Sequence, residues 1–206
     1  DLVRSRGLGD VYKRQFLERQ RQLFSRFYFV GDEDLLEIIG NSNDPKKLQR
    51  HLNKMFAGIN ALEYVAEEGA VELRAMVSKE GEVVPFAQPV RLKKACSVVT
   101  QLQRVEQAMQ ETLAVALEQA LEAFATLEGA AFVDWIARYP SQIVLLATQV
   151  VWCRRIEAAQ KLLETTELSI GTVAEQTGFA SAAHFRRVFR ETMGTGPLQY
   201  RKSHRT

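Results

Sequence analysis

The stretch SIGTVAEQTGFASAAHFRRVFRETMG, residues 169–194, decides the fold of the C-terminal part of this chain. Its apolar residues recur at helical spacing in two short runs, on either side of a turn at 177–180 where Gly178 permits a positive φ. Ser169 and Ser181 precede the two runs, where a hydroxyl can cap a helix N-terminus. The pattern predicts two helices joined by a glycine-containing turn, a helix-turn-helix that ends at Gly194.

The second of these predicted helices has an apolar face and a basic face. Its inner face carries Phe185, Val188, Phe189 and Met193. We expect the early outward positions to approach DNA base edges, because arginine pairs with guanine and alanine can touch a thymine methyl. These positions are Ala182, Ala183 and Arg186. The expected phosphate contacts are His184, Arg187, Arg190 and Arg201. The alternative is an ordinary solvated basic face.

The flanking residues extend the helical pattern in both directions. Upstream, the apolar stripe through Ile156, Ala159 and Leu163 predicts one helix from about residue 140 to 165. Downstream, Pro197 suits the first turn of a final short helix. Residues 154–206 hold nine Lys or Arg against five Glu, whereas the rest of the chain holds 18 basic and 20 acidic residues. Only this tail therefore favours a polyanionic partner.

The spacing of residues in this part of the chain is similar to that in a known protein family. The pattern is Arg155-Ile-Glu-Ala-Ala-Gln-Lys-Leu-Leu163, Ile170-x-x-Val-Ala174, Gly178-Phe179, Phe185-x-x-x-Phe-Arg190, Gly194-x-x-Pro197 and Tyr200-Arg201. It resembles the final helix-turn-helix of AraC/XylS-type transcription regulators, with Gly196 where the family usually has Ser or Thr. The resemblance implies double-stranded DNA as the partner of 169–206. The family uses two such units and only the second is present, so we expect weak binding, with Kd about 10⁻⁴–10⁻⁶ M.

The upstream residues predict helices around one β-hairpin. Acids at 32–34 suit the first turn of a helix, and Pro45 starts a second helix that stops near Gly58. Between about 61 and 92 the apolar period changes to two, which predicts an antiparallel hairpin with a turn at 79–81. A long apolar stripe at 102–124 and another at 132–139 predict two more helices. The predicted fold class is therefore mainly α with one β-hairpin.

Several upstream motifs also resemble a known family. They are Arg26-Phe-Tyr-Phe-Val-Gly-Asp-Glu-Asp-Leu-Leu-Glu-Ile-Ile-Gly-Asn41, His51-Leu-Asn-Lys-Met-Phe-Ala-Gly-Ile59, Glu80-Gly-Glu-Val-Val-Pro-Phe86, Val105-Glu-Gln-Ala-Met109 and Trp135-Ile-Ala-Arg-Tyr-Pro-Ser-Gln-Ile143. Residues 16–152 resemble the linker of cytoplasmic dynein heavy chains. The resemblance implies a mechanical element that bends across the ATPase ring of its parent, without catalysis of its own. Gly-Lys never occurs in this sequence, so no phosphate loop and no bound nucleotide are expected.

The remaining chemistry-bearing residues predict no active site. We expect no catalytic residue, cofactor or metal, because no nucleophile–base pair or ligand cluster appears. A metal cluster at Asp32, Glu33 and Asp34 is the alternative to their role in a helix first turn. His51 is expected to be a surface or capped histidine. Cys96 and Cys153 stand far apart, which favours a reducing compartment. No apolar run is long enough for a membrane span. The expected location is cytoplasmic.

The predicted organisation has three parts. Residues 5–15 are similar to adapter-derived peptides in translated metagenomic assemblies. We therefore expect residues 1–15 to be a non-native segment, with a disordered arm as the alternative. The first residue is Asp1 and not Met, so we expect an incomplete translation product. Residues 16–152 form the dynein-linker-like part and 153–206 the helix-turn-helix. The hypotheses are a DNA-binding regulator fragment, a motor fragment with an artefactual tail, and a genuine fusion. An assembly artefact at the join is the expected origin.

Overall fold

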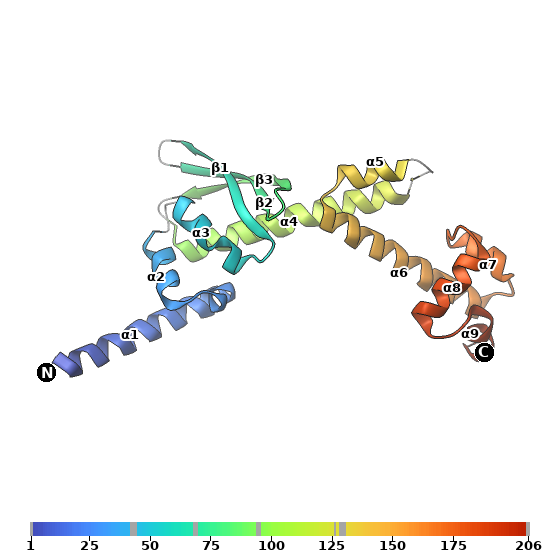
Figure 1. The fold of residues 1–206 in the computed structure, drawn as a ribbon, viewed down its shortest axis with the longest axis horizontal. Coiled ribbons are helices and arrows are strands. Elements are labelled where there is room, and N and C mark those ends of the chain that lie inside the picture. The colour runs from blue at the N-terminus through green and yellow to red at the C-terminus, as the bar shows by residue number, and fades with distance from the viewer. Residues whose placement is uncertain are drawn as a thin grey trace. The chain divides into compact units, whose positions relative to one another are not determined.

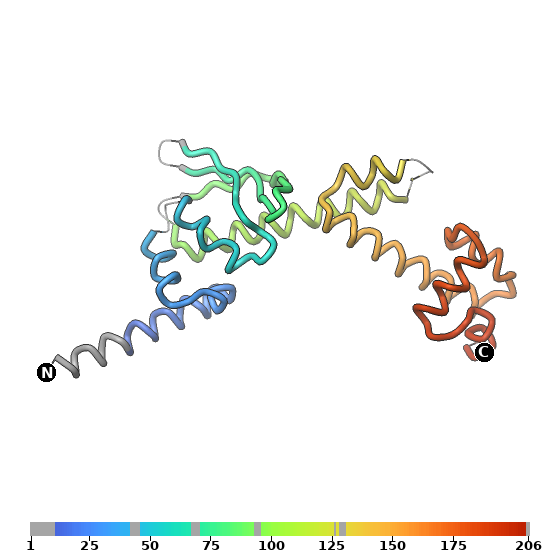
Figure 2. Tube along the Cα trace, in the orientation of Figure 1, coloured from blue at the N-terminus to red at the C-terminus, as the bar shows by residue number. Residues whose placement is uncertain are grey.

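The chain forms two compact units of mainly helical structure. The computed structural model describes residues 2–41, 45–67, 70–93, 96–125, 127 and 131–204 (Figure 2). The first unit is Asp1–Glu118 and the second is Gln119–Thr206, so the boundary falls within helix α4, Val98–Ala125. Helices and one antiparallel sheet make up the described residues (Figure 1), which confirms the predicted fold class.

The first unit begins with helices α1 (Leu2–Leu23), α2 (Asp32–Gly40) and α3 (Pro45–Met55), with a 3-10 helix, η1 (Ser25–Phe29), after α1. Helix α1 includes most of the segment 1–15, which the sequence had excluded from the fold. Residues 11–16 are exposed, whereas Leu17 is fully buried. A helix anchored by such a residue extends readily, because propagation adds one hydrogen bond per residue and needs no new nucleus.

The sheet has three strands where the sequence predicted two. Strands β1 (Ile59–Glu67), β2 (Ala70–Ser78) and β3 (Val83–Lys93) pair antiparallel in the order β1-β2-β3. The predicted hairpin is β2–β3, and its turn contains Gly81 at a φ of 84°. Pro85 pairs with Ala75 beside a register shift, a place where a missing N–H costs little. The third strand, β1, extends the sheet on the other side of β2.

The core of the first unit lies among α1, η1, α2, α3, the sheet and the start of α4. Its fully buried side chains include Leu17, Phe27, Leu35, Leu52, Leu73, Leu102 and Val105. Arg26 joins three of these elements. Its Nε donates to Oε1 of Glu106 at 2.7 Å, its Nη1 donates to the Met55 carbonyl at 3.0 Å, and its guanidinium lies 4.7 Å from the Phe56 ring centre.

The second unit contains the end of α4 and helices α5 (Ala131–Arg138), α6 (Ser141–Thr165), α7 (Ile170–Gln176), α8 (Ala182–Met193) and α9 (Pro197–His204). Trp135 of α5 donates from Nε1 to the Ala120 carbonyl at 3.0 Å, which fixes α5 on α4. The join near Trp152–Ile156 lies inside the continuous helix α6, as predicted. Within the described ranges, no helix combines the length and apolarity that crossing a membrane requires.

Candidate nucleic-acid interface

The interface is built on the two capped helices α7 and α8. The Ser169 hydroxyl accepts a hydrogen bond from the Thr172 N–H at 3.1 Å, and Ser181 accepts one from the His184 N–H at 3.1 Å. Both predicted caps are therefore confirmed. Each cap satisfies one of the free N–H groups of a helix start and contributes about 1 kcal/mol. The helices consequently begin at defined residues, which fixes the faces that they present.

Two glycines end these helices in the left-handed region. Gly178 has a φ of 75° and Gly194 a φ of 69°, so both positions favour residues without a Cβ. A Cβ at Gly178 would also lie 3.3 Å from the Arg155 guanidinium of α6. The turn between α7 and α8 thus passes close to α6, and its glycine allows this approach.

The inner faces of α7 and α8 form one core with α6 and α9. Its buried residues are Ile156, Ala159, Leu163, Ile170, Val173, Ala174, Phe179, Phe185, Val188, Phe189 and Tyr200. The ring of Phe185 lies 5.0 Å from that of Phe179 and 5.4 Å from that of Phe189. This core buries Phe185, Val188 and Phe189 of the predicted inner face of α8, and the three arginines of the helix are exposed.

The three predicted base contacts lie on the first two turns of α8. Ala182 is half-buried, whereas Ala183 and Arg186 are exposed. Arg186 also lines a cavity of about 420 Å³ together with Arg190 and the residues at the start of α9. Arg186 is thus the predicted base-contacting residue whose guanidinium is available to a ligand. Whether it contacts a base stays a prediction.

Two of the predicted phosphate contacts also lie on the exposed face of α8. Arg187 is exposed and its Nη1 lies 3.5 Å from Oε1 of Glu191, one helical turn away. Such an exposed pair is weak and can exchange for a phosphate. Arg190 is exposed, and its guanidinium lies 3.7 Å from the position of a Cβ on Gly196. Arg186, Arg187 and Arg190 together form what we call the α8 arginine face.

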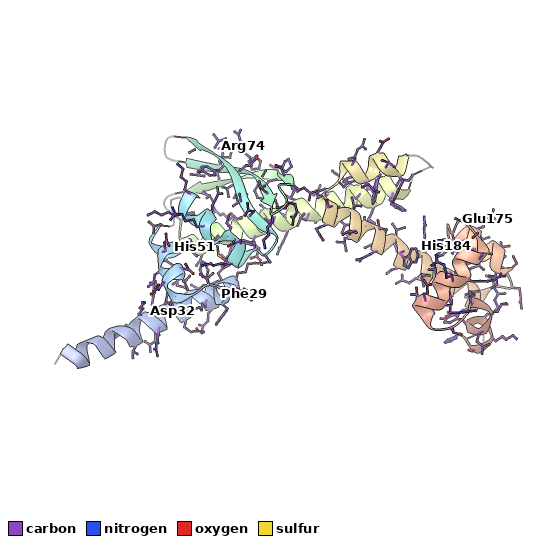
Figure 3. All side chains as sticks on the ribbon, viewed as in Figure 1. Phe29, Asp32, His51, Arg74, Glu175 and His184 are labelled. Carbon is purple, nitrogen blue, oxygen red and sulfur yellow. The ribbon has the colours of Figure 1, made fainter. Side chains whose placement is uncertain are left out.

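His184 is placed differently from the other predicted contacts. Its ring packs edge-on against Phe179 at 5.9 Å and Trp152 at 6.3 Å, measured between ring centres, and the side chain is half-buried (Figure 3). The sequence suggested a phosphate contact for His184, which lies in the first turn of α8. Trp152 of α6 draws the ring toward the core, so its main contacts are aromatic.

Arg201 also turns toward its own protein. Its Nη2 donates to the Leu168 carbonyl at 2.6 Å, and its buried Nε has no hydrogen-bond partner among the described atoms. The guanidinium therefore ties α9 to the segment before α7. The sequence did not indicate this hydrogen bond, because Leu168 and Arg201 approach each other only in the folded unit.

Sequence reasoning missed a polar connection between α6 and α9. The Tyr200 hydroxyl donates to Oε1 of Glu164 at 2.7 Å and accepts from Nε2 of Gln160 at 3.3 Å. The hydrogen bond to Glu164, together with burial, raises the pKa of Tyr200. Gln160 and Glu164 lie one turn apart on α6, but nothing in the local sequence pattern indicates that they bond to Tyr200 of α9. They position α9 and do not face a ligand.

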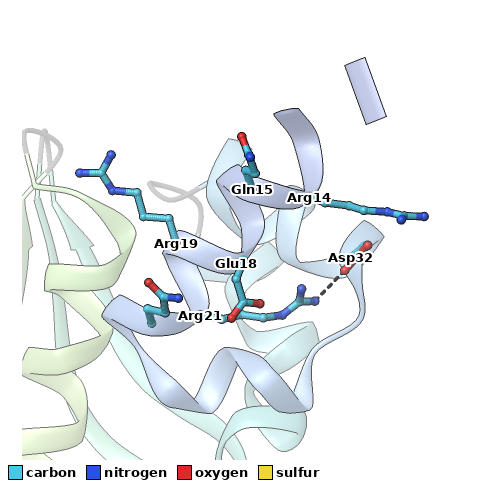
Figure 4. A pocket seen from close by; sticks show the side chains of 7 residues that line it. Arg14, Gln15, Glu18, Arg19, Arg21 and Asp32 are labelled. Carbon is cyan, nitrogen blue, oxygen red and sulfur yellow. Dashed lines mark hydrogen bonds and ion pairs between the residues drawn. The ribbon is translucent and has the colours of Figure 1, made fainter. Parts of the chain in front are cut away.

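A second cavity lies in the first unit, on α1, and lacks the features of a binding site. It has a volume of about 720 Å³ and is lined by Arg14, Gln15, Glu18, Arg19, Arg21, Gln22 and Asp32. Arg21 is paired with Asp32 at 2.7 Å, and this hydrogen bond lowers the pKa of Asp32. Arg14 and Arg19 point in opposite directions (Figure 4), so these two charged groups do not converge on one ligand position.

Comparison with known families matches two separate parts of the chain. The family described as "Dynein heavy chain, N-terminal region 2" matches residues 13–120, just over half of the chain. The family described as "Helix-turn-helix domain" matches residues 146–203. The predicted two-part composition is therefore confirmed.

Individual relatives agree with the first match. The chain is 36% identical to the cytoplasmic dynein heavy chain of Dictyostelium discoideum over 202 aligned residues, which cover 88% of this chain and 4% of that protein. It is 43% identical to the cytoplasmic dynein heavy chain of Drosophila melanogaster over 159 residues, 74% of this chain and 3% of that protein. The chain thus spans a small fraction of the length of these relatives.

Among solved structures, the C-terminal domain of AraT, a response regulator from Geobacillus stearothermophilus, is 24% identical and covers 46% of this chain and 86% of that one. The TM-score of this comparison is 0.35. Through residues 13–120 the chain belongs to the dynein heavy chain family, and residues 146–203 add a helix-turn-helix domain.

Proposed function

We propose that the helix-turn-helix of the second unit binds double-stranded DNA, as part of an AraC-type transcription regulator module joined to a dynein linker segment. The observation that carries the proposal is the α8 arginine face, three exposed guanidinium groups on a helix whose other face is buried. A helix presented in this way fits the width of the major groove. The proposal includes no catalytic step, cofactor or nucleotide.

The electrostatics of the unit support a polyanionic ligand. Residues 154–206 hold nine basic residues against five acidic ones. Of the acids, Glu164 is engaged by Tyr200 and Glu191 lies against Arg187. Arg186 and Arg190 lie on one cavity at the start of α9, where backbone amides add to the positive potential. A phosphate or a base edge could approach both arginines together.

Binding by this single unit is expected to be weak and salt-sensitive. One recognition helix supplies few base contacts, so phosphate neutralisation contributes most of the affinity. We expect a Kd for a mixed-sequence duplex of about 10⁻⁴–10⁻⁶ M at physiological salt. The logarithm of the binding constant should fall linearly with the logarithm of the salt concentration, because each neutralised phosphate releases counterions.

The first prediction concerns the α8 arginine face. The variant Arg186→Ala/Arg187→Ala/Arg190→Ala should weaken binding of the full chain to a fluorescein-labelled duplex at least tenfold, measured by fluorescence anisotropy. Arg187 and Arg190 are the expected phosphate contacts, so the logarithmic salt slope should fall by about 0.9 for each of them, roughly 1.8 in total. The replaced side chains are exposed, so the core of the unit should stay intact.

A matched control separates the site from general charge. Arg104 is an exposed arginine of α4 in the first unit, and Arg104→Ala makes the same chemical change away from α8. It should leave both the affinity and the salt slope unchanged. If the triple variant binds like the wild type, or if Arg104→Ala weakens binding as much per residue as the triple variant does, the DNA-binding proposal fails.

A second candidate function follows from the family of the first unit. We propose that residues 16–152 derive from the linker of a cytoplasmic motor, where they would lie against the ATPase ring of the parent protein. The match over residues 13–120 and the identity of 36–43% to the two heavy chains described above support this origin. The Arg26 connections among η1, α3 and α4 suit an element that transmits force, because they resist separation of these helices.

The second prediction tests the motor origin directly. Residues 16–120 should replace the matching residues of the Dictyostelium heavy chain with microtubule gliding retained, since the two sequences share one family. A flexible Gly/Ser segment of equal length should abolish gliding, because it cannot transmit force. A graft that binds nucleotide normally but glides no better than the Gly/Ser control would contradict the proposal.

A further inference from the structure

Three metal-ligating side chains gather between helices α2 and α3 of the first unit. Asp34 and Glu37 stand three residues apart on one face of α2, and His51 comes from α3. His51 is only 5% exposed, so it is not the surface histidine that was one of the two expectations. The sequence of α3 alone does not indicate this burial, because the neighbours of the ring include Asp34 and Glu37 of α2.

The two ring nitrogens of His51 face carboxylates without bonding to them. Nε2 lies 3.3 Å from Oε2 of Glu37, and Nδ1 lies 3.5 Å from Oδ1 of Asp34. Neither nitrogen makes a hydrogen bond within the described residues. A buried polar group normally has a partner, and an exception needs an explanation. Both carboxylates thus lie close to a buried imidazole whose nitrogens make no hydrogen bond.

One separation in this cluster matches that of two ligands on one small cation. Zinc holds imidazole nitrogen and carboxylate oxygen at about 2.0–2.2 Å, which puts two tetrahedral ligands about 3.3–3.5 Å apart. The Nε2–Oε2 separation of 3.3 Å falls at this value. One donor atom from each of the three residues lies within 4.8 Å of the others. Asp34 faces Nδ1 and not Nε2, so its carboxylate must rotate toward Nε2 to share a cation with Glu37 and His51.

We propose that Asp34, Glu37 and His51 bind a divalent cation of the zinc class. His51 supplies one neutral imidazole nitrogen, Glu37 and Asp34 supply one oxygen each, and water completes the coordination. A mixed nitrogen and oxygen set favours zinc and its neighbours over calcium or magnesium, which prefer oxygen alone. Three protein ligands with an open position resemble a solvent-accessible zinc site.

Lys54 prepares this site and also restrains it. Its Nζ donates to Oδ2 of Asp34 at 2.6 Å, which leaves Oδ1 facing the imidazole. This hydrogen bond is the main cause that lowers the pKa of Asp34, so the carboxylate is ionised at neutral pH. Hydrogen-bonded carboxylates of this kind orient a metal site. The lysine charge also opposes the cation, so we expect moderate affinity.

A bound cation would join α2 to α3. The unfolded chain does not hold the three ligands together, so binding free energy would add to the stability of the folded first unit. The expected signature is a rise of the melting temperature of this unit with added zinc. Cobalt bound in the same place should give the visible absorption of a low-coordinate ion.

The test uses the full chain after treatment with a chelator, and a matched pair of variants. Glu37→Gln removes a proposed ligand, whereas Glu33→Gln makes the same change at an exposed position of the same helix. We expect zinc to raise the melting temperature of the wild type and of Glu33→Gln equally. Glu37→Gln should weaken the affinity about 10- to 100-fold and remove the cobalt absorption.

Two outcomes would overturn the proposal. Zinc that binds Glu37→Gln as tightly as the wild type must use other ligands, such as Cys153 or the other histidines. A melting temperature indifferent to zinc would show that Asp34, Glu37 and His51 do not hold the cation. Asp34→Asn serves as a second ligand variant if Glu37→Gln fails to fold.

Discussion

Phe185→Ala is expected to unfold the helix-turn-helix and to abolish its DNA binding. Phe185 is fully buried, and its ring contacts those of Phe179 and Phe189 at 5.0 and 5.4 Å. Replacement of a buried phenylalanine by alanine leaves a cavity and costs about 3–5 kcal/mol. A core of this size supplies only a few kcal/mol of net stability, so the loss removes most or all of it.

Tryptophan fluorescence reports this event selectively. The chain has two tryptophans, Trp135 and Trp152, and both belong to the second unit. Trp152 lies 6.2 Å from Phe179 and 6.3 Å from His184, between ring centres, so its emission should follow the packing of α6 on the helix-turn-helix. The emission of Phe185→Ala should shift to the red before denaturant is added.

The control for this variant is Leu198→Ala in α9. Leu198 is 56% exposed, and its loss should change the free energy of unfolding by no more than about 0.5 kcal/mol. If Phe185→Ala keeps a native fluorescence spectrum and a native urea midpoint, the apolar face of α8 does not anchor this unit. The arrangement of the α8 arginine face would then lack its structural basis.

The features of this fold that sequence predicts are local ones. Ser169 and Ser181 cap helices through their own neighbours, and Gly194 ends α8 through its own φ, so adjacent residues suffice to place them. The hairpin β2–β3 was also found, because its strands alternate and its turn contains Gly81. The outward positions of Arg186 and Arg187 followed from helical spacing alone.

Features that depend on distant partners escaped prediction. Strand β1 has register shifts at Ile59/Ala61 and at Glu63/Tyr64, which break the period of two by which strands are recognised. Arg201 and His184 are drawn inward by the Leu168 carbonyl and by Trp152, respectively. His51 is buried by α2, seventeen residues before it at Asp34. Each of these placements needs the tertiary structure.

The join between the two family patterns illustrates the same limit. Helix α6 runs from Ser141 to Thr165 without interruption, and it buries Ile143 and Ala147 before the join and Ile156 and Ala159 after it. Helical spacing tolerates many splices, because apolar residues three or four positions apart share a face. A continuous helix is therefore compatible with either a genuine fusion or an artefactual one.

Phe27→Ala is expected to destabilise the first unit by about 3–5 kcal/mol and to leave the second unit unchanged. Phe27 is fully buried in η1, and its ring meets that of Phe24 edge-on at 5.0 Å. Its core contains no residue of the helix-turn-helix core, so the two losses should be independent. Far-UV circular dichroism should show an early unfolding transition that tryptophan fluorescence does not follow.

Phe29→Ala makes the same substitution on the same 3-10 helix and is the matched control. Phe29 is 74% exposed, so its loss removes little buried surface and should shift the transition hardly at all. The comparison of Phe27→Ala with Phe29→Ala therefore isolates the effect of burial on stability, because both variants lose the same type of side chain. If Phe27→Ala shifts the fluorescence transition as far as the dichroism transition, the two units unfold together. The continuous helix α4 would then transmit the damage from one core to the other, and the first unit could not be treated as an independent folding unit.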